Sequence, residues 1–342
     1  QAFLSQHIGD LENLEAYTHF QKTIGHLERI FETTPELVVH DLHPRYLSTE
    51  WAKAQSSVTT LGVQHHHAHL AACMAENKLS APVIGLIMDG TGYGTDGTIW
   101  GGEVLVGDYA KALRFAHFEP MPLPGGDAAI KAPWRIAVSY LYKAFGETMP
   151  DLRLLQENDA LPIIEMVRRK INSLMTSSLG RLFDAVATLS GGRPTIRYEG
   201  QAAIEFMQKA DGLDVPPFDF DIIQAQGSRQ LPVSQLIRGV AEAVKNGEPI
   251  SRLSSRFHRT LIDLFKKIAN EARQETGIRD VVLSGGVFQN MILFEGLIPA
   301  LEKEGFRVFT HREVPTNDGG LSLGQVLIGR EYLATRYEGV IS

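Results

Sequence analysis

Four histidines lie within five residues in the segment VQHHHAHL at 63–70. A β-branched run before them predicts a strand, and apolar residues at helical spacing over 69–79 predict a helix. Residues four apart lie on one face of a helix, so His65 and His69 can present imidazoles to one ion, while His66 with His69 is the competing pair. Such a pair suits a divalent transition metal that takes a further ligand from elsewhere in the chain. For any single histidine, helix capping or a hydrogen bond in a crevice is the alternative.

The composition excludes several classes of protein. Of the 342 residues, 44% are hydrophobic, which is enough for a core in two domains or in one bilobal fold. The net charge of -7 and the scattered Lys and Arg residues give no footprint for nucleic acid. A single cysteine, Cys73, excludes an internal disulfide, fits a reducing compartment and is expected to be a core residue. Without an apolar run of about 18 residues or a signal peptide, we expect a cytoplasmic protein with no membrane partner.

The chain begins at Gln1 with AFLSQHIGDLEN, which has the character of structured sequence. We therefore expect a fragment of a longer protein, with a short strand within residues 1–10. Strands alternate with helices over the first 80 residues, which predicts an α/β lobe.

A buried strand is predicted at 82–89 (PVIGLIMD), where the apolar run is nearly continuous. A glycine-rich segment follows, and alternating strands at 98–106 and 112–118 complete an antiparallel meander. The loop at its mouth is expected to offer backbone N–H groups to phosphate, and Asp89 there can face a metal or a metal-bound water. An ordinary hairpin turn is the alternative. The loop residues are Asp89, Gly90, Thr91, Gly92 and Gly94.

Charged residues in the middle of the chain are candidates for contacts with a ligand. A loop rich in Pro and Gly at 120–133 leads into a helical insertion that runs to about Met175. Asp127, Lys131 and Arg135 can contact an anionic substrate there, with a solvated surface as the alternative.

Asp184 interrupts the apolar stripe of a helix predicted at 176–191. A carboxylate beside such a stripe needs a partner, such as a ribose hydroxyl or an arginine. Asp184 is thus a candidate for nucleotide binding.

Two segments near the end of the chain predict ligand binding at one edge of a sheet. SGGVFQN at 284–290 follows a short strand at 281–283, and a strand, a Gly-Gly turn and a helix offer N–H donors to phosphate. Asp318 follows the next strand, on the edge where Ser284–Val287 and Asp89 are expected. Asp318 is therefore the best candidate for the missing metal ligand, with a helix N-cap as the alternative.

The motifs together resemble those of a known family, the carboxyl-terminal Kae1-like domain of the HypF carbamoyltransferases, which are hydrogenase maturation proteins. They follow the family's order over almost the whole chain, and SQHIGDLEN and PLPGGD favour HypF over two related groups. Those groups are the tRNA threonylcarbamoyl-transfer proteins and the antibiotic O-carbamoyltransferases. The motifs are SQHIGDLEN (5–13), DLHPRYLST (41–49), VQHHHAH (63–69), DGTGYGTDGTIWGGE (89–103), PLPGGDAAIKAPWR (122–135), RLFDAVA (181–187), YEGQAA (198–203), SGGVFQN (284–290) and NDGGLSLGQ (317–325).

The resemblance implies an α/β fold with actin-like ATPase (ASKHA) architecture, in which two ribonuclease-H-like lobes enclose a nucleotide cleft. Residues 1–80 are expected to form the first lobe, which lacks the family's usual opening strand. Residues 81–342 are expected to form the second lobe, with a helical insertion near 120–176.

The resemblance also implies a reaction and a partner. Carbamoyl-adenylate, made from carbamoyl phosphate and ATP in a YrdC-like domain, would donate its carbamoyl group. The carboxyl-terminal cysteine of HypE would accept it, on the route to the cyanide ligands of NiFe hydrogenase.

Site residues follow from matching the motifs position by position. His65, His69 and Asp318 match the metal site, for which Fe2+, Zn2+ or Mn2+ is suitable. Asp89, Lys131 and Arg135 are the expected catalytic residues. Asp184 matches the ribose-binding carboxylate, and the segment from Ser284 to Asn290 matches the lining of the phosphates and base. The full set expected to bind ATP or carbamoyl-adenylate is Gly90, Thr91, Gly92, Gly94, Asp184, Gly192, Glu199, Ser284, Gly285, Gly286, Val287 and Asn290.

The chain departs from the family's full pattern. The acylphosphatase-like domain, the zinc fingers and the YrdC-like domain are not seen, so this chain alone is not expected to make carbamoyl-adenylate. A sugar- or acetate-kinase-like phosphotransferase is one alternative function, although a kinase holds Mg2+ with carboxylates rather than paired histidines. A noncatalytic remnant that binds nucleotide or HypE is the other.

Overall fold

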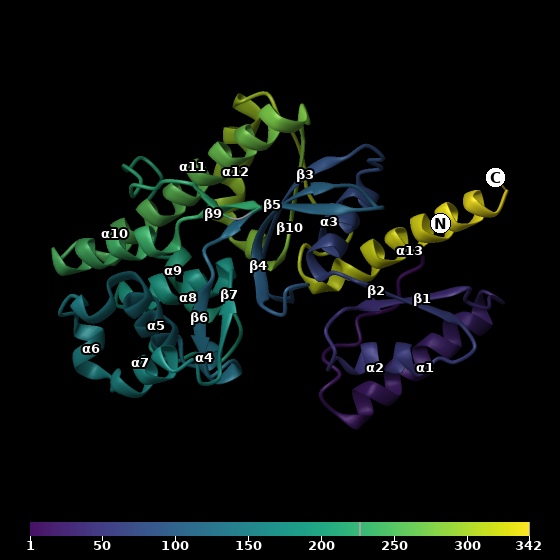
Figure 1. Ribbon diagram of the computed structural model, residues 1–342, viewed down its shortest axis with the longest axis horizontal. Helices are drawn as coiled ribbons and strands as arrows, with labels where there is room; N and C mark the ends of the chain where they lie inside the picture. The colour runs from purple at the N-terminus through teal and green to yellow at the C-terminus, as the bar shows by residue number, and fades with distance from the viewer. Residues whose placement is uncertain (226, 342) are drawn as a thin grey trace.

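Strand β3 is the centre of the large sheet in the computed structural model, which describes residues 1–225 and 227–341. It pairs in parallel with β10 and antiparallel with β4, and the sheet has the order β11-β10-β3-β4-β5-β9-β8 (Figure 1). The alternating pattern therefore correctly predicted the antiparallel meander β3-β4-β5. The strand bounds are β3 Val83–Tyr93, β4 Ile99–Gly107, β5 Ala112–Phe118, β8 Ile223–Ala225, β9 Ser228–Leu231, β10 Asp280–Ser284 and β11 Arg307–Phe309.

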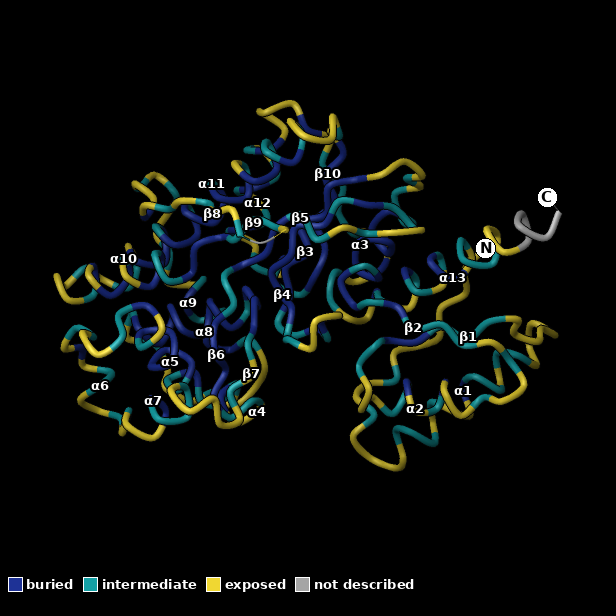
Figure 2. The backbone as a smooth tube through the Cα atoms, viewed as in Figure 1, coloured by how far each residue is buried: buried dark blue, intermediate teal, exposed yellow. Residues whose placement is uncertain are grey.

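The two faces of β3 pack against different helices, because successive side chains of a strand point to opposite faces. Ile84 and Leu86 face the large core, and Val83 and Ile87 face α3. Burial of each such side chain contributes about 1.5–3 kcal/mol, and Figure 2 shows the strand dark blue along this stretch. The helices of the large core are α5 Pro133–Phe145, α8 Leu179–Leu189, α9 Gln201–Met207, α10 Val233–Lys245, α11 Ile250–Thr276 and α12 Met291–Lys303.

A smaller α/β unit formed by the first part of the chain lies beside the large sheet (Figure 1). The prediction of a strand within residues 1–10 is wrong. This segment has neither helix nor strand. It lies along α1, with Gln6 Nε2 3.2 Å from His19 Nε2. The unit consists of α1 Leu14–Ile30, β1 Leu37–Asp41, α2 Leu47–Lys53 and β2 Thr59–Val63, and β1 and β2 pair in parallel.

Helix α3 (His65–Glu76) begins four residues earlier than predicted, so all four histidines lie in its first two turns. The Gln64 side chain ends the preceding extended segment by accepting a hydrogen bond from the backbone N–H of His67, at 2.9 Å. The apolar side of α3 then packs under β3, where a Cβ on Gly85 would lie 2.7 Å from Leu70 Cδ1.

Helix α13 (Leu321–Ile341) joins the two units through close glycine contacts. A Cβ at Gly324 would collide with the carbonyl oxygen of Ala68 in α3, and a Cβ at Gly329 would lie 2.6 Å from Val39 Cγ2 in β1. The first turn of this helix follows η3 (Asp318–Gly320). The contact at Gly324 thus sets the distance between Asp318 and the histidines.

Gly324→Ala is expected to destabilise the chain. Forcing a methyl group against the Ala68 carbonyl costs about 1–3 kcal/mol. Gly25→Ala in α1 is the matched control, since open space surrounds that helical glycine and the same change there stabilises by roughly 0.5–1 kcal/mol. Urea denaturation measures both variants. A Gly324→Ala midpoint at or above that of the wild type would contradict the close contact.

The insertion between β5 and α8 begins and ends on paired strands. Part of the loop expected at 120–133 is instead strand β6 and helix α4, because β6 pairs with β7 and thereby returns the insertion to β4. A small apolar cluster of Val138, Ile163 and Ile164 lies inside it. Among the described residues, no helix is both long and apolar enough to span a membrane. The elements are β6 Met121–Pro124, α4 Asp127–Lys131, α5, η1 Gly146–Thr148, α6 Arg153–Glu157, α7 Leu161–Arg168 and β7 Ser173–Thr176.

Candidate metal and nucleotide site

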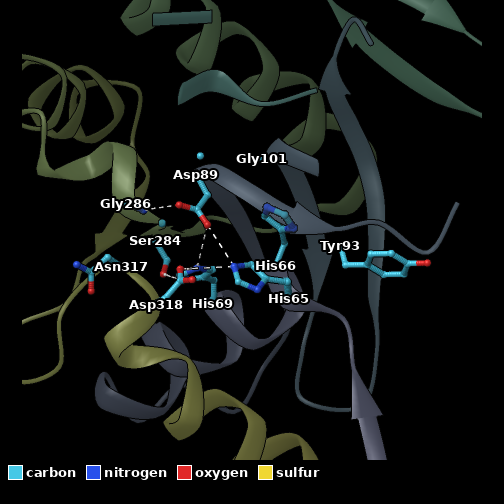
Figure 3. Close-up of polar contacts among 12 residues, drawn as sticks. His65, His66, His69, Asp89, Tyr93, Gly101, Ser284, Gly286, Asn317 and Asp318 are labelled. Atoms are coloured by element: carbon cyan, nitrogen blue, oxygen red, sulfur yellow. Dashed lines mark hydrogen bonds and ion pairs between the residues drawn. The ribbon is translucent and has the colours of Figure 1, made fainter. Parts of the chain in front are cut away.

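Two histidines and two carboxylates converge where α3, β3 and η3 meet (Figure 3). His65 Nε2 lies 3.2 Å from Asp89 Oδ2 and 3.6 Å from Asp318 Oδ1. His69 Nε2 lies 3.5 Å from each of these oxygens. One potential ligand atom from each residue lies within 4.8 Å of all the others. The structure therefore brings the histidine pair predicted from the i, i+4 spacing together with Asp318, the expected third ligand, and with Asp89, which was expected to face the metal.

The neighbouring histidines have other contacts. His66 Nδ1 lies 3.1 Å from Gln64 Nε2, and its ring centroid is 6.1 Å from that of Trp100. His67 Nε2 lies 2.7 Å from the carbonyl oxygen of Asp108. The competing pair of His66 with His69 is therefore not the one placed at the cluster.

Asp318 contacts the histidines instead of capping a helix. Asn317 is the N-cap of η3, since its Oδ1 accepts a hydrogen bond from the N–H of Gly319 at 3.1 Å. The Asp318 side chain is 60% exposed, whereas those of His65 and His69 are buried. The cluster is consequently open to solvent on the Asp318 side.

Asp41 fixes the ring of His65. Its Oδ2 lies 2.8 Å from His65 Nδ1, and its Oδ1 accepts the backbone N–H of His43 at 2.7 Å. A carboxylate at Nδ1 holds the proton there and leaves the Nε2 lone pair directed at the cluster. The sequence reasoning missed this role, although an acidic residue at the carboxyl end of a predicted strand was a usable signal.

Electrostatics at the cluster favour a bound positive charge. Burial alone would lower the pKa of His65, but hydrogen bonds with Asp318, Asp41 and Asp89 raise it well above its ordinary value. Burial would raise the pKa of Asp89, yet His65 and His69 hold it well below its usual range. The two carboxylates thus draw protons onto the imidazoles when no other cation is present.

The donor set fits a divalent metal. His69 Nε2 is buried and makes no hydrogen bond within the described part of the chain. Two imidazoles and two carboxylates suit Fe2+, Zn2+ or Mn2+, the ions expected from the sequence. His65, His69, Asp89 and Asp318 are therefore the residues that can hold the ion, and its identity stays a prediction.

The glycine-rich segment after Asp89 is a continuation of β3 rather than the expected loop. The pairing of β3 with β4 shifts register between Met88 and Gly92, which is a β-bulge that includes Gly90 and Thr91. Ser178 Oγ donates to the bulged carbonyl of Gly90 at 2.6 Å. The true turn begins only at Gly94, whose N–H donates to Thr98 O at 2.9 Å.

The packing of His65 and His66 leaves no room for a side chain at position 92, which is Gly92. A Cβ at this position would lie 2.5 Å from His66 Cε1 and 2.8 Å from His65 Cδ2. A larger residue would therefore displace the first turn of α3. This packing accounts for the glycine, and a contact with phosphate stays a prediction.

The SGG segment reaches the cluster as predicted, but its polar groups already have partners. Gly285 has a φ of +105°, and its N–H donates to Thr316 O at 2.9 Å. Gly286 N–H donates to Asp89 Oδ1 at 3.2 Å. Ser284 Oγ lies 3.2 Å from His69 Nδ1. The segment thus orients Asp89 and His69.

Val287 lies in a short 3-10 helix, η2 (Gly286–Gln289), and α12 begins only at Met291. Asn290 is the N-cap of α12: its Oδ1 accepts the N–H of Leu293 at 3.1 Å. The Nδ2 of Asn290 lies 2.8 Å from His258 Nε2. Both ends of this amide are engaged, so contact with a nucleotide base would require it to release one of them.

Asp184 and Arg181 form a buried ion pair on α8, with Arg181 Nη2 3.1 Å from Asp184 Oδ2. Burial raises the pKa of Asp184 to about 6, while Arg181 opposes this change. Neither carboxylate oxygen has a partner in hydrogen-bond geometry within the described chain, and neither do Arg181 Nε and Nη1. The arginine partner considered for Asp184 is therefore present, and its ribose contact stays a prediction.

Arg181 on α8 and Glu199 in the segment before α9 both approach the bulge of β3. A Cβ at Gly90 would lie 3.6 Å from Glu199 Oε1 and 3.7 Å from Arg181 Nη2. Glu199, an expected nucleotide-binding residue, and Arg181, the partner of Asp184, thus both lie close to the residue that follows Asp89. Gly192 packs differently, since a Cβ there would lie 2.6 Å from the Ala187 carbonyl oxygen at the end of α8.

Lys131 and Arg135 do not reach the cluster. Lys131 ends α4 and is exposed, and Arg135 on α5 places Nη2 3.8 Å from Met166 Sδ. Figure 1 shows both helices well separated from α3. Neither side chain is brought to the cluster, so their catalytic role stays a prediction without support from this geometry.

Two family models match this chain. Residues 1–76 match the HypF Kae1-like domain, and residues 85–325 match the second subdomain of the carbamoyltransferase Kae1-like domain. The chain belongs to the HypF family. The resemblance predicted from the motifs is therefore confirmed.

Curated HypF relatives align with nearly the whole chain. Carbamoyltransferase HypF2 of Cupriavidus necator is 36% identical over 361 residues, covering 96% of this chain and 44% of the relative. Carbamoyltransferase HypF of Rhizobium leguminosarum is 38% identical over 341 residues, covering 99% and 44%. A HypF homolog of Cupriavidus necator is 36% identical over 310 residues, covering 86% and 77%. The chain spans less than half the length of the first two relatives and most of the third.

Solved HypF structures share the fold. The crystal structure of full-length HypF in the phosphate- and nucleotide-bound form has a TM-score of 0.90 and 40% identity, covering 97% of this chain and 52% of that one. HypF of T. kodakarensis has a TM-score of 0.86 and 32% identity, covering 97% and 45%. The predicted α/β fold of the actin-like, Kae1-like type is confirmed. The lobe boundary at residue 80 stays a prediction.

Proposed function

We propose that this chain is the carbamoyl-transfer part of a HypF carbamoyltransferase, acting in the cytoplasm on the route to the cyanide ligands of NiFe hydrogenase. The donor is carbamoyl-adenylate, and the acceptor is the thiolate of the carboxyl-terminal cysteine of HypE. The observation that carries the proposal is the convergence of His65, His69, Asp89 and Asp318 next to the glycine-rich end of β3, in a chain of this family.

The residues of the chain hold and orient the reacting groups. Asp41 sets the ring of His65, and the N–H of Gly286 sets the carboxylate of Asp89. The chemistry that a divalent metal supplies at such a site is Lewis-acid polarisation of the carbamoyl oxygen. An adenylate bound by Asp184, Glu199 and the backbone near Gly90 would have its reactive end beside this cluster.

No nucleophile is required from the chain itself. Cys73, its one cysteine, is buried, and burial raises the pKa of the thiol. A thiol in that state is a poor nucleophile. We assign the attacking thiolate to HypE and the synthesis of the adenylate to a YrdC-like domain, as the resemblance to the family implies.

Two alternatives remain in different classes. An actin-like phosphotransferase would hold Mg2+ through carboxylates, so paired imidazoles at the cluster count against it. A remnant that binds HypE or nucleotide without turnover would keep the same geometry. A transfer assay separates the remnant from the enzyme.

Carbamoyl transfer to HypE is the decisive test. The chain is mixed with HypE, preformed carbamoyl-adenylate and Fe2+, Zn2+ or Mn2+, and the carboxyl-terminal peptide of HypE is examined by mass spectrometry. We expect a carbamoyl group on the terminal cysteine and none on HypE in which that cysteine is replaced by serine. Unmodified HypE with all three metals would favour the remnant.

A further inference from the structure

A chain of polar contacts runs from the cluster to the far end of α3. His69 Nδ1 lies 3.2 Å from Ser284 Oγ, and Ser284 Oγ lies 2.8 Å from His311 Nε2. His311 Nδ1 in turn lies 3.1 Å from Glu76 Oε2. The side chains of His311 and Glu76 are only 4% and 8% exposed. These contacts link the side chains of three separate segments behind one imidazole of the cluster.

Glu76 fixes which group donates and which accepts in each hydrogen bond of this series. Its carboxylate only accepts hydrogen bonds, so His311 Nδ1 carries a proton and donates it. His311 Nε2 is then an acceptor, and the Ser284 hydroxyl donates a hydrogen bond to it. The Ser284 oxygen accepts in turn from His69 Nδ1–H. The proton of neutral His69 is thereby kept on Nδ1, and the Nε2 lone pair points at Asp89 and Asp318.

The segment that carries His311 is fixed to the end of α3. Glu76 Oε1 accepts the backbone N–H groups of Arg312 and Glu313, the latter at 2.6 Å. Asn77 Nδ2 donates to the carbonyl oxygen of Thr310 at 3.0 Å. Three backbone groups thus hold the main chain around His311, and its ring is held at both nitrogens by Ser284 and Glu76.

We propose that Glu76 and His311 are positioning residues that act through Ser284 to fix the tautomer of His69 for metal binding. The inference rests on the proposed metal site. Asp41 directly holds the proton of His65 on Nδ1, and the proposed series does the same for His69 through Ser284. Ser284, which the sequence placed at the nucleotide phosphates, is the middle link.

Glu76→Gln tests the direction of the series with little change of shape. The amide oxygen can stay with the N–H groups of Arg312 and Glu313, which places the NH2 group against His311 Nδ1. His311 then donates from Nε2 to Ser284, and Ser284 donates to His69 Nδ1. The proton of neutral His69 moves to Nε2 and blocks the ligand position.

We expect Zn2+ binding, measured by calorimetry, to weaken about 10–100-fold in Glu76→Gln, the usual effect of losing a contact behind a metal ligand. Glu313→Gln is the matched control, since it removes the same charge from an exposed side chain in the neighbouring loop. Equal affinity in Glu76→Gln and wild type, or an equal loss in Glu313→Gln, would overturn the proposal.

The double variant separates a linked series from a general effect of charge. Ser284→Ala breaks the series, so adding Glu76→Gln to it is expected to weaken Zn2+ binding no further. An additive loss would show that Glu76 acts without Ser284 and would refute its positioning role. Ser284→Ala also serves if Glu76→Gln does not fold, because unchanged Zn2+ affinity in it refutes the same role.

Nitrogen-15 spectra of labelled histidines, recorded at alkaline pH without metal, report which nitrogen of neutral His69 carries the proton. Assignment uses His69→Gln. The expected tautomer has the proton on Nδ1 in wild type and on Nε2 in Glu76→Gln, and the same tautomer in both overturns the proposal. This readout does not depend on carbamoyl transfer or on Zn2+ binding, so it distinguishes failure of this inference from failure of the proposed function.

Discussion

Replacing both His65 and His69 with Ala is expected to leave this chain without bound metal. The change removes the two imidazoles and leaves Asp89 and Asp318, which are oxygen ligands with little preference for transition metals. The loss of Zn2+ affinity should exceed the roughly 10–100-fold caused by removing a supporting contact. Elemental analysis of the purified protein and calorimetric titration with Zn2+ measure it.

The control for this variant is His66→Ala with His67→Ala, which removes as many imidazoles from the same helix. The His66 ring packs edge-on against that of His65, but neither His66 nor His67 supplies a ligand atom to the cluster, so the metal should be retained. Circular dichroism verifies that both variants keep the helix content of the wild type. Equal metal content in the two double variants would refute the assignment of the ligands.

The pair of histidines was predictable because it depends on local geometry. A spacing of four residues places His65 and His69 on one helical face wherever the helix lies. Asp318 was predictable to the extent that the carboxyl ends of strands meet at one edge. Asp41 and His311 were not assigned, because their contacts with His65 and Ser284 depend on how separate segments pack.

Strand β3 shows where sequence patterns mislead. The glycines after Asp89 predicted a loop, yet the strand continues through a bulge to Tyr93. Gly92 is a glycine because the rings of His65 and His66 lie against it, and not because the chain turns there. Small residues required by packing and by turns look alike in a sequence, and only the tertiary contacts separate them.

The apolar pattern of residues 250–276 predicts one long helix, and α11 has those bounds, whereas the strand expected within 1–10 does not form. Apolar residues recur along α11 with one helical period over many turns, so the pattern averages out local exceptions. A short apolar segment carries no such redundancy. It becomes a strand only where a partner edge is available, and here it lies along α1.

Asp184→Ala is expected to destabilise the chain by about 3–5 kcal/mol, because Arg181 is left as an unpaired charge in the interior. The side chains of Arg181 and Asp184 are 3% and 1% exposed, so water cannot replace the lost partner. Urea denaturation should be measured well above the pKa of about 6 to which burial raises Asp184, where the carboxylate is ionised.

Arg181→Met combined with Asp184→Ala separates the ion pair from the proposed contact with ribose. Removing both charges leaves no buried unpaired ion, so the double variant should regain most of the stability lost in Asp184→Ala. Its affinity for ATP, measured by calorimetry, should stay below that of the wild type if Asp184 binds the ribose hydroxyls. Restored stability together with wild-type ATP affinity would limit Asp184 to balancing the charge of Arg181. Persistent weak binding in a stable variant assigns the Arg181–Asp184 pair to the nucleotide, since the fold is then intact and only these two side chains have changed.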